Sequence, residues 1–189
     1  MKVKKQILKL RSLILYWSGT GNTAKVANAI QKGMERVGSK PTIKRIEDAR
    51  DEELLDYDLV CLGSPSHMFI PAEPVLRFIK EKMIDYGKRG FIKPCAPKVR
   101  GKHAVVFCTY SGPHTGIDEA IPAGKCMRQF LEHLGFEVLA EWYVVGEFHG
   151  NELLSTKGRL GNIKGRPNVQ DLACVEEDTV KLVNKLLKE

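Results

Sequence analysis

The sequence predicts an α/β fold in which a parallel sheet of five strands is covered by helices on both faces. Short apolar runs alternate along the chain with segments of helical period, which is the pattern of strands joined by crossover helices. The apolar runs show little polar alternation, as expected of strands that are buried on both faces. The length of 189 residues suits one domain with one core, and residues 1–189 are expected to form it.

Five apolar runs are the strand candidates, and each is rich in Leu, Ile, Val or Phe. In chain order they are Leu13–Trp17, Thr42–Ile46, Leu59–Gly63, Ala104–Thr109 and Val138–Val145. Helical segments lie between them, so the sequence predicts a three-layer sandwich. Ligands of such sheets bind beyond the carboxyl ends of the strands, and the loops after the first, third and fourth strands are therefore the candidate site.

Four helices are expected, with apolar residues recurring three or four positions apart. They run from about Thr23 to Val37, from Glu73 to Ile84, around Met127–Leu134, and from about Asp171 onward. Gly38 and Gly135 are expected to end the first and third helices, since glycine readily adopts the left-handed conformation of a helix end. Pro74 suits the first turn of the second helix, and Asn168 is the expected cap of the last.

The chain has no segment that predicts a membrane span. Its longest apolar runs, such as Leu13–Trp17, are far shorter than the ~20 residues that cross a bilayer. The basic start resembles a signal peptide, but Lys9 and Arg11 interrupt its apolar part and no cleavage site of small residues follows. The sequence therefore predicts a cytoplasmic protein.

The five cysteines predict neither a metal site nor a disulfide framework. They are Cys61, Cys95, Cys108, Cys126 and Cys174. No two of them form a C-x-x-C pair, and their number is odd. Cys61 and Cys108 fall within strand candidates, where cysteine serves as a small buried apolar residue.

Part of the net charge of +7 lies in the segment Gly87–Lys102, GKRGFIKPCAPKVRGK, which contains no acidic residue. An exposed loop is the ordinary structure of such a run. The alternative is a face that docks an acidic partner or the phosphate of a substrate. Nucleic acid is not expected to bind, because the segment has a single aromatic residue, Phe91, and no recognised binding motif.

The loop between the first strand and the first helix, SGTGNT at residues 18–23, predicts an anion site. The start of a helix presents unpaired backbone N–H groups and the positive end of the helix dipole. The two glycines let the backbone close around an anion, and the three hydroxyl side chains add donors to it. A phosphate can therefore be held here without a lysine.

Other interpretations of this loop are weaker. A helix cap needs one hydroxyl, and the loop has three. The nucleoside-triphosphate pattern G-x-x-x-x-G-K-[ST] is not met. The dinucleotide pattern G-x-G-x-x-A is met from Gly19 to Ala24, with Glu47 near the end of the second strand as the candidate ribose ligand, and it stays open.

The loop matches the pattern [S/T]-x-T-G-x-T, and in this respect the chain resembles the flavodoxin family. The resemblance covers most of the chain from Ser12 onward, although only this loop is strongly specific. It implies a flavodoxin-like sandwich with a five-stranded parallel sheet in the order 2-1-3-4-5, and noncovalently bound FMN. The residues that it assigns to the FMN phosphate are Ser18, Gly19, Thr20, Gly21, Asn22 and Thr23.

The resemblance extends by position to two further loops. After the third strand, Pro65, Ser66, His67 and Met68 are expected beside the isoalloxazine ring, whereas Ile70 is expected to cover the core. After the fourth strand the resemblance implies that the ring is bracketed by Thr109, Tyr110, Ser111, Gly112 and Gly116. Tyr110 is the candidate for ring stacking, and His114 is expected to be an ordinary surface residue.

Three functions are weighed on this basis. The first is electron transfer through FMN to a redox partner protein, which is expected to be acidic because the pI of this chain is about 9.1. The alternative is an NAD(P)H-dependent quinone or flavin reductase, with basic residues of Lys88–Lys102 attracting the phosphates of the pyridine nucleotide. The third is a binding module that has lost flavin. No residue is expected to act as a catalytic acid or base, and a homodimer stays open.

Overall fold

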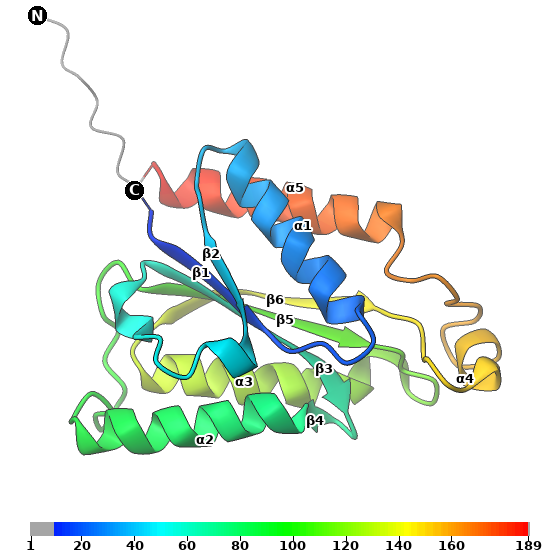
Figure 1. Ribbon diagram of the computed structural model, residues 1–189, viewed down its shortest axis with the longest axis horizontal. Coiled ribbons are helices and arrows are strands. Elements are labelled where there is room, and N and C mark those ends of the chain that lie inside the picture. Colours follow the sequence, from blue (N-terminus) through cyan, green and yellow to red (C-terminus); the bar gives the residue numbers. More distant parts are fainter. Residues whose placement is uncertain (1–9, 189) are drawn as a thin grey trace, which may run out of the picture.

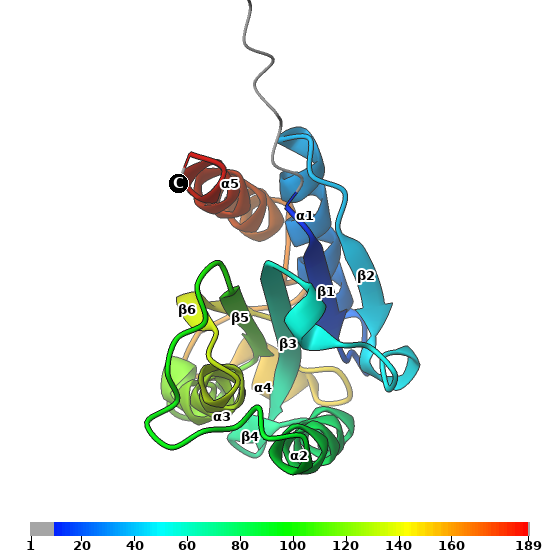
Figure 2. The ribbon, with the colours of Figure 1, turned by 90° about the vertical axis from the view of Figure 1, so that its left-hand side faces the viewer.

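The computed structural model describes residues 10–188 and has three layers, with the sheet between two pairs of helices (Figures 1 and 2). The start of the chain that resembles a signal peptide lies largely outside these residues. Within residues 10–188 no helix is long and apolar enough to span a membrane.

Five strands form the parallel sheet, in the order β2-β1-β3-β5-β6. Their bounds are Ser12–Tyr16 for β1, Thr42–Arg45 for β2, Leu59–His67 for β3, His103–Tyr110 for β5 and Glu137–Val145 for β6. This is the predicted order 2-1-3-4-5, to which the structure adds β4, Ile70–Pro71, antiparallel to the end of β3. The predicted fold class is confirmed.

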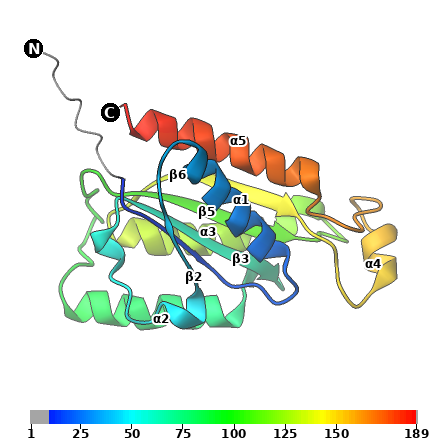
Figure 3. The same ribbon diagram turned by 45° about the horizontal axis from the view of Figure 1, so that its top comes forward.

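Two helices cover each face of the sheet (Figure 3). They are α1 (Asn22–Arg36) and α5 (Val169–Leu186) on one face, and α2 (Glu73–Lys88) and α3 (Ile121–His133) on the other. The second helix continues past its predicted end at Ile84. Four short elements were not predicted: α4 (Glu152–Thr156) and the 3₁₀ turns Ile46–Asp48, Leu54–Asp56 and Gly116–Glu119.

The strands divide their side chains between two cores. Leu13 and Leu15 pack in the cluster on the α2 and α3 side, whereas Ile14 between them packs in the cluster on the α1 and α5 side. Both sides of the sheet therefore need apolar residues, which explains the absence of polar alternation. Cys61 and Cys108 are buried as predicted, and burial raises the pKa of the Cys108 thiol to about 12.

The predicted helix ends are present at α1 and α5. Gly38, with a φ of 79°, lets the chain turn after α1 so that Ser39 N donates to Met34 O at 3.0 Å. At the start of α5, Asn168 and Asp171 each accept a hydrogen bond from the backbone N–H of the other. The Gly38 turn leads α1 into β2 at the amino edge of the sheet, and the Asn168 cap starts α5 at the carboxyl edge.

Gly63 is expected to be essential to the packing at the centre of the sheet. A Cβ at this position would lie 2.1 Å from two ring atoms of Phe107, so Gly63→Ala forces the ring or the strand to move. We expect a loss of about 1–3 kcal/mol in the free energy of unfolding, measured by urea denaturation. In a Phe107→Leu background the same change should cost less, and an equal cost in both backgrounds would contradict this explanation.

Candidate functional site

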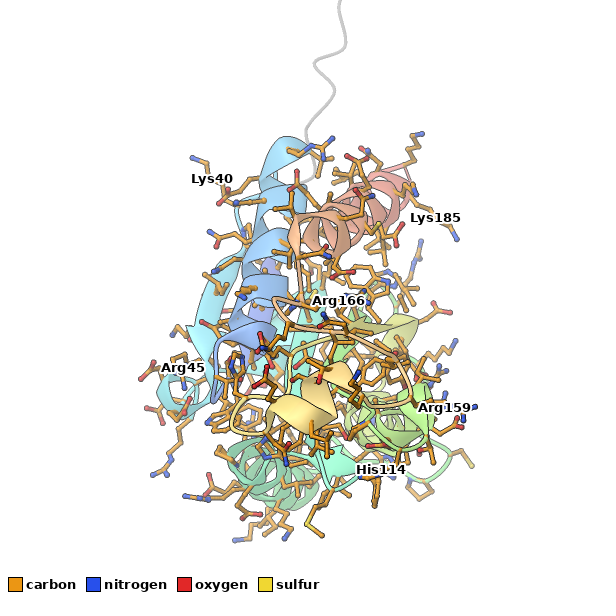
Figure 4. All side chains as sticks on the ribbon, turned by 90° about the vertical axis from the view of Figure 1, so that its right-hand side faces the viewer. Lys40, Arg45, His114, Arg159, Arg166 and Lys185 are labelled. Carbon is orange, nitrogen blue, oxygen red and sulfur yellow. The ribbon has the colours of Figure 1, made fainter. Side chains whose placement is uncertain are left out.

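The loops that follow β1, β3 and β5 meet at the carboxyl edge of the sheet, because these strands are parallel neighbours. Figure 4 looks onto this edge, where Arg45, His114, Arg159 and Arg166 surround the loops. A cavity of about 260 Å³ lies between the loops and also contacts the segment after β6. The predicted site residues that line it are Ser18, Gly19, Thr20, Asn22, Thr23, Pro65, Ser66, His67, Thr109, Tyr110 and Ser111.

The first loop, residues 18–23, leaves several backbone hydrogen-bond donors free for a ligand. Ser18 Oγ accepts a hydrogen bond from Gly21 N at 3.1 Å, and the φ of 95° at Gly21 turns the chain into α1. Within residues 10–188 no hydrogen bond uses the backbone N–H groups of Thr20, Asn22 or Thr23. Because α1 begins at Asn22, these donors lie at the positive end of its dipole, where an anion is favoured.

A hydrogen bond between two threonines joins the first loop to the loop after β5. The hydroxyl oxygens of Thr23 and Thr109 are 2.7 Å apart, and the residues are only 1% and 2% exposed. Both line the cavity, and each hydroxyl has room for a second hydrogen bond to a ligand. This contact fixes the start of α1 relative to the end of β5.

Asn22 connects the first loop to the segment after β6. Its Nδ2 donates to Glu147 O at 3.0 Å, whereas its Oδ1 is buried and has no partner within residues 10–188. An unpartnered buried acceptor favours a ligand that carries a hydroxyl donor. The cavity therefore suits a phosphate that continues into a polyol chain.

The segment after β6 contributes four lining residues that the sequence analysis missed. They are Gly146, Glu147, Phe148 and His149. The available signal was topological: β6 is parallel to β5, so its carboxyl end reaches the same edge. The buried hydroxyl of Ser155 holds this segment, since it accepts from Phe148 N at 3.0 Å and donates to Phe148 O at 2.9 Å.

A second cavity of about 310 Å³ adjoins the first, between the β3–β4 turn and the loop after β5. The two cavities share Ser66, Tyr110, Ser111 and Phe148. The second is lined largely by apolar side chains, among them Met68, Phe69, Pro113 and Leu154. A cavity with donors at the start of α1, next to one lined largely by apolar side chains, suits a ligand with a phosphate at one end and a flat ring system at the other.

The β3–β4 turn is strained and exposed. Met68 and Phe69 have φ values of 47° and 73°, which residues other than glycine rarely adopt. Their side chains are 87% and 54% exposed. Such strain is common where a loop holds a ligand. The prediction that Ile70 covers the core is wrong, because the turn directs it outward and leaves it 49% exposed.

The third strand is longer than predicted. It continues through Pro65 and Ser66 to His67, and Pro65 pairs with Thr109 of β5. Pro65, Ser66 and His67 were predicted to lie in a loop after the third strand, but the structure places all three within β3. The sheet pairing extends to the floor of the cavity, which places Ser66 and His67 more firmly than a loop would.

The remaining predicted residues lie around the cavities. Met68 and Gly112 line the second cavity, and Gly21 and Gly116 line neither. Gly112 and Gly116 are buried with positive φ values, and Gly116 N donates to Gly112 O at 3.1 Å. A Cβ on Gly112 would lie 2.5 Å from Gly116 O, so these glycines shape the loop that carries Tyr110 and Ser111.

The titratable rings at the cavity are held in their neutral forms. Partial burial lowers the pKa of His67, whose ring lies edge-on to Trp17 with 5.6 Å between centroids. Burial also raises the pKa of Tyr110, against a smaller opposite effect of Arg166. An anion in the first loop would therefore be bound by dipoles and hydroxyls without an ionic partner among these rings.

Arg45 is the cation at the rim of the first loop, and the sequence analysis did not single it out. Its guanidinium lies 3.4 Å from Ser18 O and 3.1 Å from a carboxylate oxygen of Glu47. Glu47 is thus paired with Arg45 and lines neither cavity. The dinucleotide interpretation loses its candidate ribose ligand.

The basic segment Gly87–Lys102 is remote from both cavities. It leads from the end of α2 to the start of β5, at the amino edge of the sheet and opposite the loops described above (Figure 1). Most of the segment is exposed, as the ordinary interpretation predicted. The alternative that this segment attracts the phosphates of a pyridine nucleotide at the cavities is wrong, because the segment lies at the amino edge of the sheet and the cavities lie at the carboxyl edge.

Comparison with known proteins gives a family assignment. The sequence matches the flavodoxin family over residues 14–167. It is 31% identical to a flavodoxin of Megasphaera elsdenii, over 51% of this chain and 63% of that protein, so the match spans less than two thirds of that relative. It is 27% identical to an NAD(P)H dehydrogenase (quinone) of Archaeoglobus fulgidus, over 74% of this chain and 83% of that one.

A solved structure supports the fold. The structure of a flavodoxin from the domain Archaea matches with a TM-score of 0.63 at 17% identity, and the match covers 94% of this chain and 99% of that chain. At this identity the likeness concerns the fold.

The environment of His67 predicts its titration. Because burial against Trp17 opposes the charged ring, His67 should take up its proton below the ordinary pKa of about 6.5. The unfolded chain then binds this proton at a higher pH than the folded one, so the His67 contribution to stability declines as the pH falls below about 6.5. NMR titration of the ring should give the lowered pKa, with His67→Gln assigning the signal. Trp17→Leu should raise the pKa toward 6.5, and an unchanged value would contradict this cause.

Proposed function

We propose that this chain, which belongs to the flavodoxin family, transfers electrons through noncovalently bound FMN. Membership implies a flavin cofactor. The observation that carries the choice of FMN is the pair of adjoining cavities, one with donors at the start of α1 and the other lined largely by apolar side chains. A terminal phosphate suits the first cavity, and an isoalloxazine ring suits the second.

The proposed phosphate site uses dipoles in place of a cation. The N–H groups at the start of α1 and the hydroxyls of Ser18, Thr20 and Thr23 would hold the phosphate. Asn22 Oδ1, which is buried and unpartnered in residues 10–188, would accept a hydrogen bond from a ribityl hydroxyl. The residues fit the group.

The proposed ring site brackets a flat ligand from two sides. The Met68–Phe69 turn lies on one side of the second cavity, and Tyr110 and Gly112 lie on the other. Stacking on Tyr110 would contribute about 0.5–1.5 kcal/mol beyond burial. The flavin supplies the redox chemistry when it is bound, and the chain binds it, orients it and limits its contact with water.

The redox partner would dock at the carboxyl edge, where the ring site opens. Several basic residues there are paired with acids: Arg45 with Glu47, Lys164 with Glu152, and Arg166 with Asp171. The expectation of an acidic partner was based on the charge of the whole chain. The charges at this edge are mixed, so they favour an acidic partner much less than the pI does.

Substitution of Thr20 tests the phosphate site. Thr20→Glu places a carboxylate against the phosphate and should weaken FMN binding by about 100-fold or more, as measured by quenching of flavin fluorescence. Thr20→Val removes only the hydroxyl and should cost about tenfold. Riboflavin lacks the phosphate and should bind more weakly than FMN. Its affinity should be the same for the natural sequence, Thr20→Glu and Thr20→Val. If Thr20→Glu weakens both ligands equally, the phosphate does not lie in this loop.

The quinone reductase function is the second candidate, favoured by the Archaeoglobus fulgidus relative. Neither cavity presents a second phosphate site, so we expect the purified protein with FMN to oxidise NADH or NADPH with a quinone at less than about 1 s⁻¹, under the usual enzyme range. A supplied redox partner protein should reoxidise the reduced protein rapidly. Rapid NAD(P)H turnover by the protein alone would establish the reductase.

A further inference from the structure

The positive charge of the chain gathers at the amino edge of the sheet, opposite the proposed flavin site. Figure 2 faces this edge and shows the segment that joins α2 to β5. The chain also enters β1 here, and Asp58 N donates to Arg11 O at 2.8 Å. We call the surface formed by Leu10–Arg11 and Gly87–Lys102 the amino-edge surface.

Half of the basic side chains in Gly87–Lys102 are paired. Arg89 lies 2.7 Å from Glu53, Lys98 lies 2.9 Å from Glu137, and Lys102 lies 3.6 Å from Asp58. Lys88, Lys93 and Arg100 form no ion pair within residues 10–188.

Apolar side chains are exposed beside these cations. Phe91 and Val99 are 44% and 46% exposed. Both are held in place: the Phe91 ring lies edge-on to the Tyr86 ring with 6.0 Å between centroids, and Val99 N donates to Gly135 O at 2.8 Å. Their exposure is therefore a feature of the folded surface.

An apolar cavity of about 280 Å³ lies between these side chains. Phe91, Val99 and Leu134 line it together with Lys93 and Lys102. Apolar groups surrounded by cations suit a ligand that presents hydrocarbon next to negative charge.

We propose that the amino-edge surface binds anionic phospholipid bilayers. Unpaired lysine and arginine side chains attract the headgroups, and the exposed apolar side chains reach the acyl boundary. Nucleic acid would use the cations and leave Phe91 and Val99 without a role, so the apolar component favours lipid. In this orientation the carboxyl edge, with both cavities described above, faces away from the bilayer and stays open to a redox partner.

Vesicle sedimentation tests this proposal with two variants of equal net charge. The test variant carries Lys88→Gln, Lys93→Gln and Arg100→Gln. The control carries Lys32→Gln, Arg77→Gln and Lys80→Gln, at three exposed positions of α1 and α2 that lie outside the amino-edge surface, line neither cavity and have no ion pair in the part of the chain that the structure describes. All three proteins should bind FMN equally, which separates this test from that of the proposed function.

The protein should sediment with vesicles of equal parts phosphatidylglycerol and phosphatidylcholine at low salt, and not with phosphatidylcholine alone. Each basic residue near an anionic surface contributes about fivefold in affinity, so the test variant should bind about 100-fold more weakly. The control should bind like the natural sequence. The proposal would be overturned if both variants lost vesicle affinity equally, or if the protein also bound vesicles of phosphatidylcholine alone. It would also be overturned if duplex DNA or polyglutamate displaced the protein from the vesicles at a lower concentration than the anionic lipid itself.

Discussion

The parallel pairing of β1, β3 and β5 is the constraint on which the site depends. Tyr16 is in register with Gly63, and Pro65 is in register with Thr109, so the three strands deliver their loops to one edge at nearly the same level. Gly63 makes this pairing compatible with Phe107, whose ring occupies the space where a Cβ would lie. Without this register the hydroxyls of Thr23 and Thr109 could not form the hydrogen bond that joins the first loop to the loop after β5.

The proposed binding of phosphate follows from the position of the α1 start at the carboxyl edge of the sheet. Backbone donors at a helix start are fixed by the helix, so they need no reorganisation when an anion arrives. A lysine would add charge, but it would also lose side-chain entropy on binding. The net charge of +7 is thus uninformative about this site, because much of it lies at the opposite edge of the sheet.

Strain at the ring site is balanced by its surroundings. Two consecutive left-handed residues, Met68 and Phe69, cost of order 1–2 kcal/mol each. The antiparallel pairing of Ser66 with Pro71 and of His67 with Ile70 closes the turn and holds it in that conformation. The hydrogen bond from Ala72 N to the buried hydroxyl of Ser64 fixes the chain that follows it.

The elements with local signals were predictable from the order of the amino acids alone. The apolar runs, the helix ends at Gly38 and Asn168, and the loop Ser18–Thr23 could be identified because periodicity, capping and hydroxyl density are properties of neighbouring residues. Which remote segments meet became visible only in the folded chain. Phe148 joins the site through the pairing of β6 with β5, and Gly87–Lys102 is excluded from it by the direction of α2. Both outcomes depend on contacts between residues far apart in the chain, which local patterns do not encode.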